Sequence, residues 1–112
     1  MRTPAEAAVL VVLTTAPDTA VARAIASRVV DERLAACANI VPGVTSIYRW
    51  KGEVHEDDEV LVVFKTIPAG FIALRDRIVA LHPYDVPEVL ALPAPDGSTD
   101  YVRWVTGEVV LR

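Results

Sequence analysis

One run of seven residues holds the densest group of side chains in this sequence that could bind a metal ion. The run, residues 82–88, reads His82-Pro83-Tyr84-Asp85-Val86-Pro87-Glu88. An imidazole together with carboxylates suits a borderline divalent ion such as Cu(II), Zn(II) or Ni(II). His82, Asp85 and Glu88 are therefore candidate metal ligands. The same residues also fit a simpler structure, in which the histidine contacts the last carbonyls of a helix and Glu88 forms a surface salt bridge.

Two other groups of reactive side chains have favoured structural explanations. Cys37 could be a soft-metal or redox thiol, but free cysteine is among the most buried residue types and a small core residue is the better interpretation. His55 and the acidic residues 56–59 could bind a hard cation weakly. Charge runs on strand edges more often prevent edge-to-edge pairing of sheets.

Composition narrows the class of protein. The 112 residues predict one domain spanning 1–112, and the net charge of −4 argues against nucleic acid as a partner. No phosphate-binding loop, nucleotide fingerprint, esterase elbow or zincin motif is present, so we expect no enzyme. The single cysteine fits a reducing cytosol. The apolar run at 7–13 is too short for a membrane span and a poor signal peptide, and we expect a cytoplasmic protein with no membrane partner.

The elements that must position these residues follow from periodicity. Residues 9–13 are apolar throughout and predict a central strand, and Asp18 is a good cap for an amphipathic helix ending near Val30. Residues 37–50 predict a long strand bent at Pro42-Gly43, at or near a sheet edge. A turn at Lys51-Gly52 joins it to a return strand, residues 53–66. Both arms exceed the usual strand length, so the hairpin should overhang its core.

The second half of the chain predicts one more helix, one more strand and a tail. Thr66 can cap a helix with Pro68 in its first turn, and His82-Pro83 should end it. Residues 86–92 predict a strand stopped by prolines 93 and 95. A short amphipathic segment, 101–105, should be broken by Gly107, and residues 108–111 predict a terminal strand.

This order predicts an α+β fold, the ferredoxin-like βαββαβ sandwich with an extended β-hairpin and a short C-terminal helix or strand tail. In this fold the second helix ends where the first strand ends, so Thr14, His82, Asp85 and Glu88 should gather there. Two helices cover one sheet face only. The apolar strands therefore predict that the second face meets another copy of the chain, and the hairpin would extend a neighbour's sheet.

The sequence resembles the CutA divalent-cation tolerance proteins. The resemblance runs from about Val9 to Trp104 and is carried by segments in the same order and spacing. They are LAACANIVPGVTSIYRWKG (34–52), EVLVVFKT (59–66), HPYDVPE (82–88) and YVRW (101–104). It implies a ferredoxin-like subunit in a homotrimer similar to the PII signalling proteins, with clefts between subunits.

The resemblance also implies a function, which is copper-type divalent metal binding associated with metal-ion tolerance or response. His82 and Glu88 occupy the positions that some members are thought to use for copper, while Thr14 stands where some members have a cysteine. The expected ligand is a divalent ion (Cu, Zn or Ni), with no obligatory cofactor. The alternative is a PII-like module whose cleft, lined by Lys65, Tyr84 and Trp104, binds a small ligand or a partner protein.

Overall fold

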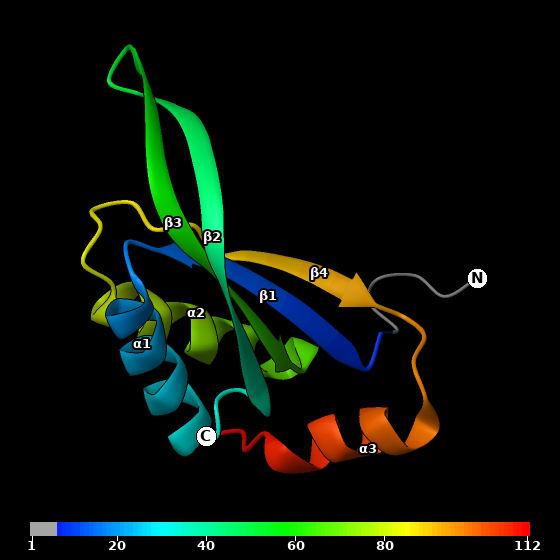
Figure 1. The fold of residues 1–112 in the computed structure, drawn as a ribbon. Coiled ribbons are helices and arrows are strands. Elements are labelled where there is room, and N and C mark those ends of the chain that lie inside the picture. Colours follow the sequence, from blue (N-terminus) through cyan, green and yellow to red (C-terminus); the bar gives the residue numbers. More distant parts are fainter. Residues whose placement is uncertain (1–6) are drawn as a thin grey trace.

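A computed structural model describes residues 7–112 and contains a four-stranded antiparallel sheet with two helices packed on one face (Figure 1). The elements in chain order are β1 (Val9–Ala16), α1 (Thr19–Asp31), β2 (Cys37–Trp50), β3 (Glu53–Thr66), the 3-10 helix η2 (Pro68–Gly70), α2 (Phe71–Leu81), β4 (Leu90–Ala94) and α3 (Thr99–Glu108). The sheet order is β2-β3-β1-β4. The predicted ferredoxin-like βαββαβ fold is confirmed.

Helices α1 and α2 pack against the same face of the sheet and form the main core with it (Figure 1). The side chain of Asp18 caps α1 by accepting a hydrogen bond of 2.8 Å from the backbone N–H of Val21, as the sequence predicts. Between the two layers lie fully or almost fully buried apolar side chains. They are Val12, Ile25, Val29, Val62, Phe64, Leu74 and Ile78.

The hairpin formed by β2 and β3 extends well beyond the rest of the sheet (Figure 1). Strand β3 pairs with β1 from Val60 to Thr66, and among the strands of the described chain residues 53–59 have only β2 beside them. A register shift between Val41 and Val44 confirms the bend predicted at Pro42-Gly43. At the tip, Lys51 and Gly52 both have positive φ, a conformation that matches the twist of a two-residue hairpin turn.

Two predictions for the C-terminal third are wrong. The fourth strand is β4, Leu90–Ala94, rather than residues 86–92, and it includes Pro93 opposite Leu10 of β1. Strand β4 lies at the sheet edge, where a proline can lack an N–H without breaking a ladder. Residues 108–111 form no strand, because α3 continues through Gly107 to Glu108.

The predicted helix cap at Thr66 is also wrong. The Thr66 hydroxyl is buried and donates a 2.9 Å hydrogen bond to the backbone carbonyl of Leu34, so it joins β3 to the turn before β2. The chain enters α2 through η2, which begins at Pro68. The C-terminal end of α2 follows the prediction, because the helix ends at Leu81 and His82 is its cap residue.

The sheet face opposite α1 and α2 is apolar and uncovered by these two helices. Residues paired directly across antiparallel strands lie on the same face. Because Val12 and Thr14 face the helices, the alternate positions of β1 face away, together with their partners in β3 and β4. This open face includes Val11, Leu13, Leu61, Val63, Leu90 and Leu92, of which Leu90 and Leu92 are 59% and 49% exposed.

Within residues 7–112, no helix combines the length and the apolar character that crossing a membrane requires.

Candidate functional site

His82 lies at the end of β1, as the topology predicts, and both of its ring nitrogens are hydrogen bonded. Nδ1 accepts the backbone N–H of Tyr84 at 3.1 Å, so the neutral ring carries its proton on Nε2. Nε2 then donates to the backbone carbonyl of Thr15 at 2.7 Å. The side chain is buried, at 8% exposure. In this arrangement the imidazole has no free lone pair for a metal ion.

The other predicted ligands do not complete a metal centre around His82. Asp85 and Glu88 are exposed on the loop between α2 and β4. In the part of the chain that the structure describes, no three His, Cys, Asp or Glu side chains come together as a metal-binding group. Thr14 is fully buried on the helix side of β1, and its hydroxyl has no hydrogen-bond partner within residues 7–112. The donor set of residues 7–112 in a single chain therefore does not fit a resident metal ion.

Tyr84 connects the loop after α2 to the base of the long hairpin. Its ring packs against that of His82, with centroids 4.6 Å apart, and its hydroxyl donates a 2.7 Å hydrogen bond to Glu59 of β3. Burial, followed by this bond to a carboxylate, raises the pKa of Tyr84 above its ordinary value of 10. The loop is thus attached to both β1 and β3.

A second tyrosine–carboxylate pair lies further along the hairpin. The Tyr48 hydroxyl donates to Asp57, and the Tyr48 ring stacks on His55 at 5.5 Å between centroids. The bond to Asp57 is the main reason that the pKa of Tyr48 is raised. The acidic run 56–59 therefore supplies two acceptors for tyrosine hydroxyls. Neither pair is predicted from the sequence above, although the alternation of residues 55, 57 and 59 places these three on one face of the hairpin.

The predicted ligand-cleft residues separate into two places. Lys65 of β3 donates to Asn39 and lies opposite Cys37 of β2, whose sulfur is 3.6 Å from the hydroxyl of Tyr101 in α3. Trp104 packs beside Tyr101, with ring centroids 5.7 Å apart. The hydrogen bond with Cys37 is the first cause of the raised pKa of Tyr101. We name this group, Asn39, Cys37, Lys65, Tyr101 and Trp104, the α3 cluster.

Tyr84 lies far from the α3 cluster in a single subunit. It contacts Glu59, six residues before Lys65 along β3, which corresponds to roughly 20 Å at ~3.3 Å per residue. Lys65, Tyr84 and Trp104 therefore do not line one cleft within a subunit. Cys37 is half-buried and free, and it contacts a phenol rather than an apolar core alone.

Comparison with known proteins places the fold and these motifs in a family. The sequence profile of the CutA1 divalent ion tolerance proteins matches residues 10–108. The chain belongs to this family. The resemblance inferred from the motifs at 34–52, 59–66, 82–88 and 101–104 is thereby confirmed.

Individual CutA proteins are similar over most of the chain. The divalent-cation tolerance protein CutA of Thermus thermophilus is 57% identical over 95 residues, which are 85% of this chain and 92% of that protein. Human protein CutA is 50% identical over 91 residues, 81% of this chain and 51% of the human protein. The solved structure of the Thermus thermophilus Cut A1 protein has a TM-score of 0.89 at 53% identity, covering 91% of this chain and 99% of that chain.

Proposed function

We propose that this CutA1-family protein acts in divalent-cation tolerance as a homotrimer, by binding rather than by catalysis. Family membership supports the tolerance role. The main support for a homotrimer is the open apolar face of the sheet. Apolar surface of this kind is normally buried between subunits of an oligomer. The hairpin, which projects past β1, is long enough to reach a neighbouring subunit. We propose the cytoplasm as its location, since its one cysteine is free.

The assembly is tested by measuring the molar mass in solution at micromolar concentration. Size exclusion with light scattering should give three times the subunit mass. Leu90→Glu places a charge on the open face and should give a monomer, and because Leu90 is 59% exposed in the subunit, the fold should survive. Ile72→Glu is the matched control, since Ile72 is 62% exposed on α2. A monomeric wild-type protein, or a trimeric Leu90→Glu variant, would contradict the proposal.

For the cation itself, we propose transient binding of Cu(II), Zn(II) or Ni(II) at His82, Asp85 and Glu88. The two carboxylates are exposed, whereas His82 can offer Nδ1 only by releasing the N–H of Tyr84. Binding is therefore expected to open the loop, and the cost of opening should keep the affinity low. A cation bound in this way is a passing ligand and needs no preformed site.

Calorimetric titration of the purified protein with each ion tests this site. The double variant His82→Ala with Glu88→Ala should lose binding, and Glu53→Ala, at an exposed carboxylate of the hairpin tip, should bind as the wild type does. Tyr84→Phe keeps the backbone N–H but loses the bond to Glu59, which should ease loop opening and strengthen binding. Unchanged affinity in the double variant would exclude the site.

The α3 cluster favours a second candidate function, a PII-like module that binds a small ligand between subunits. Lys65 and Trp104 lie at one end of the sheet, and Tyr84 lies near the other. A trimer could complete the cleft by joining these two ends from neighbouring subunits. A thermal-shift screen of nucleotides and metabolites tests this, because a ligand that binds only the folded state raises the melting temperature. If a ligand raises the melting temperature of the Lys65→Ala and Trp104→Ala variants as much as that of the wild type, the ligand does not bind in this cleft.

A further inference from the structure

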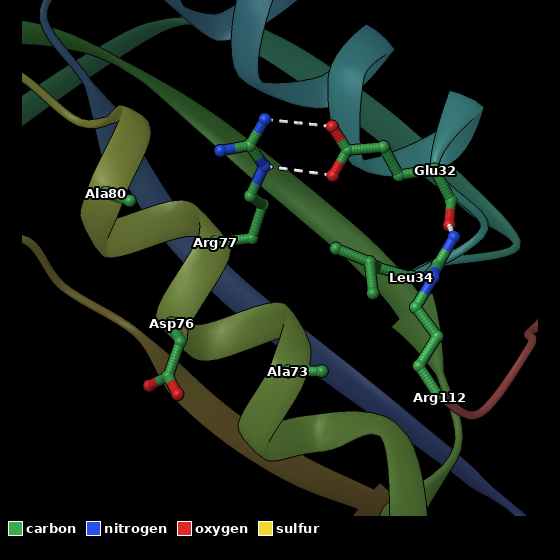
Figure 2. Close-up of a pocket in the computed structure, with 7 residues that line it drawn as sticks. All are labelled: Glu32, Leu34, Ala73, Asp76, Arg77, Ala80 and Arg112. Carbon is green, nitrogen blue, oxygen red and sulfur yellow. Dashed lines mark hydrogen bonds and ion pairs between the residues drawn. The ribbon is translucent and has the colours of Figure 1, made fainter.

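A shallow pocket lies on the helix side of the molecule, between the end of α1, the length of α2 and Arg112 (Figure 2). Its volume is about 410 Å³. The lining combines an apolar floor of Leu34, Ala73 and Ala80 with a charged rim of Glu32, Asp76, Arg77 and Arg112. None of these residues belongs to the loop 82–88 or to the α3 cluster.

Three arginines surround Glu32 at this pocket, two at its carboxylate and one at its backbone carbonyl. Arg77 donates two hydrogen bonds of 2.9 Å to the two carboxylate oxygens of Glu32, while Arg28 lies 4.0 Å from the same group. Arg112 donates to the backbone carbonyl of Glu32. The hydrogen bond from Arg77, and then the charges of all three arginines, hold the pKa of Glu32 below its ordinary value. Glu32 is ionised at neutral pH and offsets one of the three positive charges.

The remaining acidic side chain on the rim is already paired with a different arginine. Asp76 accepts a 2.9 Å hydrogen bond from Nε of Arg75, its neighbour in α2. The four charged residues that line the pocket balance, two acids against two arginines, and Arg28 and Arg75 beside them add two positive charges, on a protein whose net charge is −4. An anion would find a positive field here although the chain as a whole repels it.

Arg77 and Arg112 each have N–H groups that their bonds to Glu32 do not use, and these can donate to a further acceptor. The bonds from Arg77 to Glu32 use Nε and Nη2, and its third nitrogen points away from Glu32 in Figure 2. Arg112 contacts Glu32 through one nitrogen. A guanidinium carries five N–H donors in a rigid planar fork that matches the oxygens of carboxylates and phosphates.

We propose that this pocket binds an oxyanion, a phosphate or a carboxylate, carried on a compact partly apolar molecule. The anion contacts Arg77 and Arg112, and the apolar part covers Leu34 and Ala73. The pocket is on the helix side of the sheet, opposite the open face. It therefore remains accessible when subunits associate through the open face, and this site is independent of the function proposed above.

Titration of the 112-residue protein by NMR tests the site, with inorganic phosphate and succinate as separate probes at constant ionic strength. The chemical shifts of the backbone amides in residues 32–34 and 73–80, which line or flank the pocket, should change with ligand concentration and reach a plateau. Arg112→Ala removes one charge-assisted contact of an exposed side chain without disturbing the core. It should weaken the binding about tenfold.

The matched control removes one arginine charge at a position outside the pocket. Arg103→Ala, an exposed arginine of α3 outside this pocket, should leave the affinity unchanged. Tighter binding of phosphate than of succinate identifies a phosphorylated ligand, and the reverse order identifies a carboxylate. Shifts that fail to saturate with both probes, or equal losses in the Arg112→Ala and Arg103→Ala variants, would overturn the proposal.

Discussion

At the scale of single residues, Thr14 is unusual because its hydroxyl is buried without a hydrogen-bond partner among the described residues. It lies on the helix side of β1, among the apolar side chains of the core. A buried hydroxyl that lacks a partner costs free energy, because water has been removed from it without compensation. The neighbouring residue shows the contrast, since the carbonyl of Thr15 accepts from His82.

We expect Thr14→Val to raise the free energy of unfolding by about 1 kcal/mol, because valine has nearly the same shape and no polar atom. Thr14→Ser keeps the hydroxyl and removes a methyl group, so it should lower the stability by about 1 kcal/mol. Chemical denaturation at one fixed protein concentration measures both. A less stable Thr14→Val protein would mean that the hydroxyl makes a stabilising hydrogen bond.

We expect Tyr84 to lose its phenol proton at a higher pH than an exposed tyrosine does. Burial and the bond to Glu59 favour the neutral form of Tyr84, so its pKa is raised in the folded protein. Its contribution to stability is complete below pH 10, the ordinary pKa, and is lost as the pH rises further. In an ultraviolet titration Glu59→Gln should lower the pKa of Tyr84 only in part, because burial is the first cause. A return to the ordinary value would show that the carboxylate alone causes the shift.

At the scale of elements, the two glycines at positions 52 and 107 have opposite roles. Gly52 has a φ of +81° at the hairpin tip, where an L side chain is strained although open space surrounds it. Gly107 lies inside α3 without a positive φ, and the methyl group of an alanine there would meet nothing within 4 Å. The same substitution should therefore change stability in opposite directions at the two sites.

We expect Gly52→Ala to weaken the hairpin by about 1 kcal/mol, because alanine disfavours positive φ. Gly107→Ala should stabilise α3 by roughly 0.5–1 kcal/mol, because alanine loses less backbone freedom in a helix. Hydrogen exchange of the amides near each site separates the two effects. Faster exchange in α3 of the Gly107→Ala variant would contradict the second half of this prediction.

At the scale of the whole molecule, the open face and the hairpin leave large apolar side chains exposed in a single chain. Leu90 and Leu92 are exposed on one face of the sheet, and Ile47 and Val54 of the hairpin are 67% and 62% exposed. The part of the hairpin beyond β1 has no third strand beside it among the described residues. Isolated two-stranded hairpins are marginal in water, so contact with other subunits is expected to stabilise this one.

The melting temperature should accordingly rise with protein concentration, because association stabilises the folded state by mass action. Calorimetric scans of the wild-type protein over a hundredfold range of concentration measure this dependence. The Leu90→Glu variant should melt at a lower temperature that does not vary with concentration. A wild-type melting temperature that is constant over the range would argue against the homotrimer.

The features that the sequence alone determined are those that depend on neighbours along the chain. The cap at Asp18, the hairpin turn at Lys51-Gly52 and the helix end at Leu81 each need only a few adjacent residues. The bounds of β2 and β3 and the order of elements followed from these signals and from the periodicity between them. The family resemblance has the same origin, since its motifs are contiguous segments.

Tertiary structure alone decided which partner each polar group takes. Thr66 binds Leu34 instead of capping a helix, and Pro93 enters β4 because that strand lies at the sheet edge. Both nitrogens of His82 are taken by backbone groups, one of them 67 residues away. The pairing of Arg77 with Glu32 joins residues 45 apart. A hydrogen-bonding side chain has several acceptable partners, and only the packed core determines which of them comes within reach.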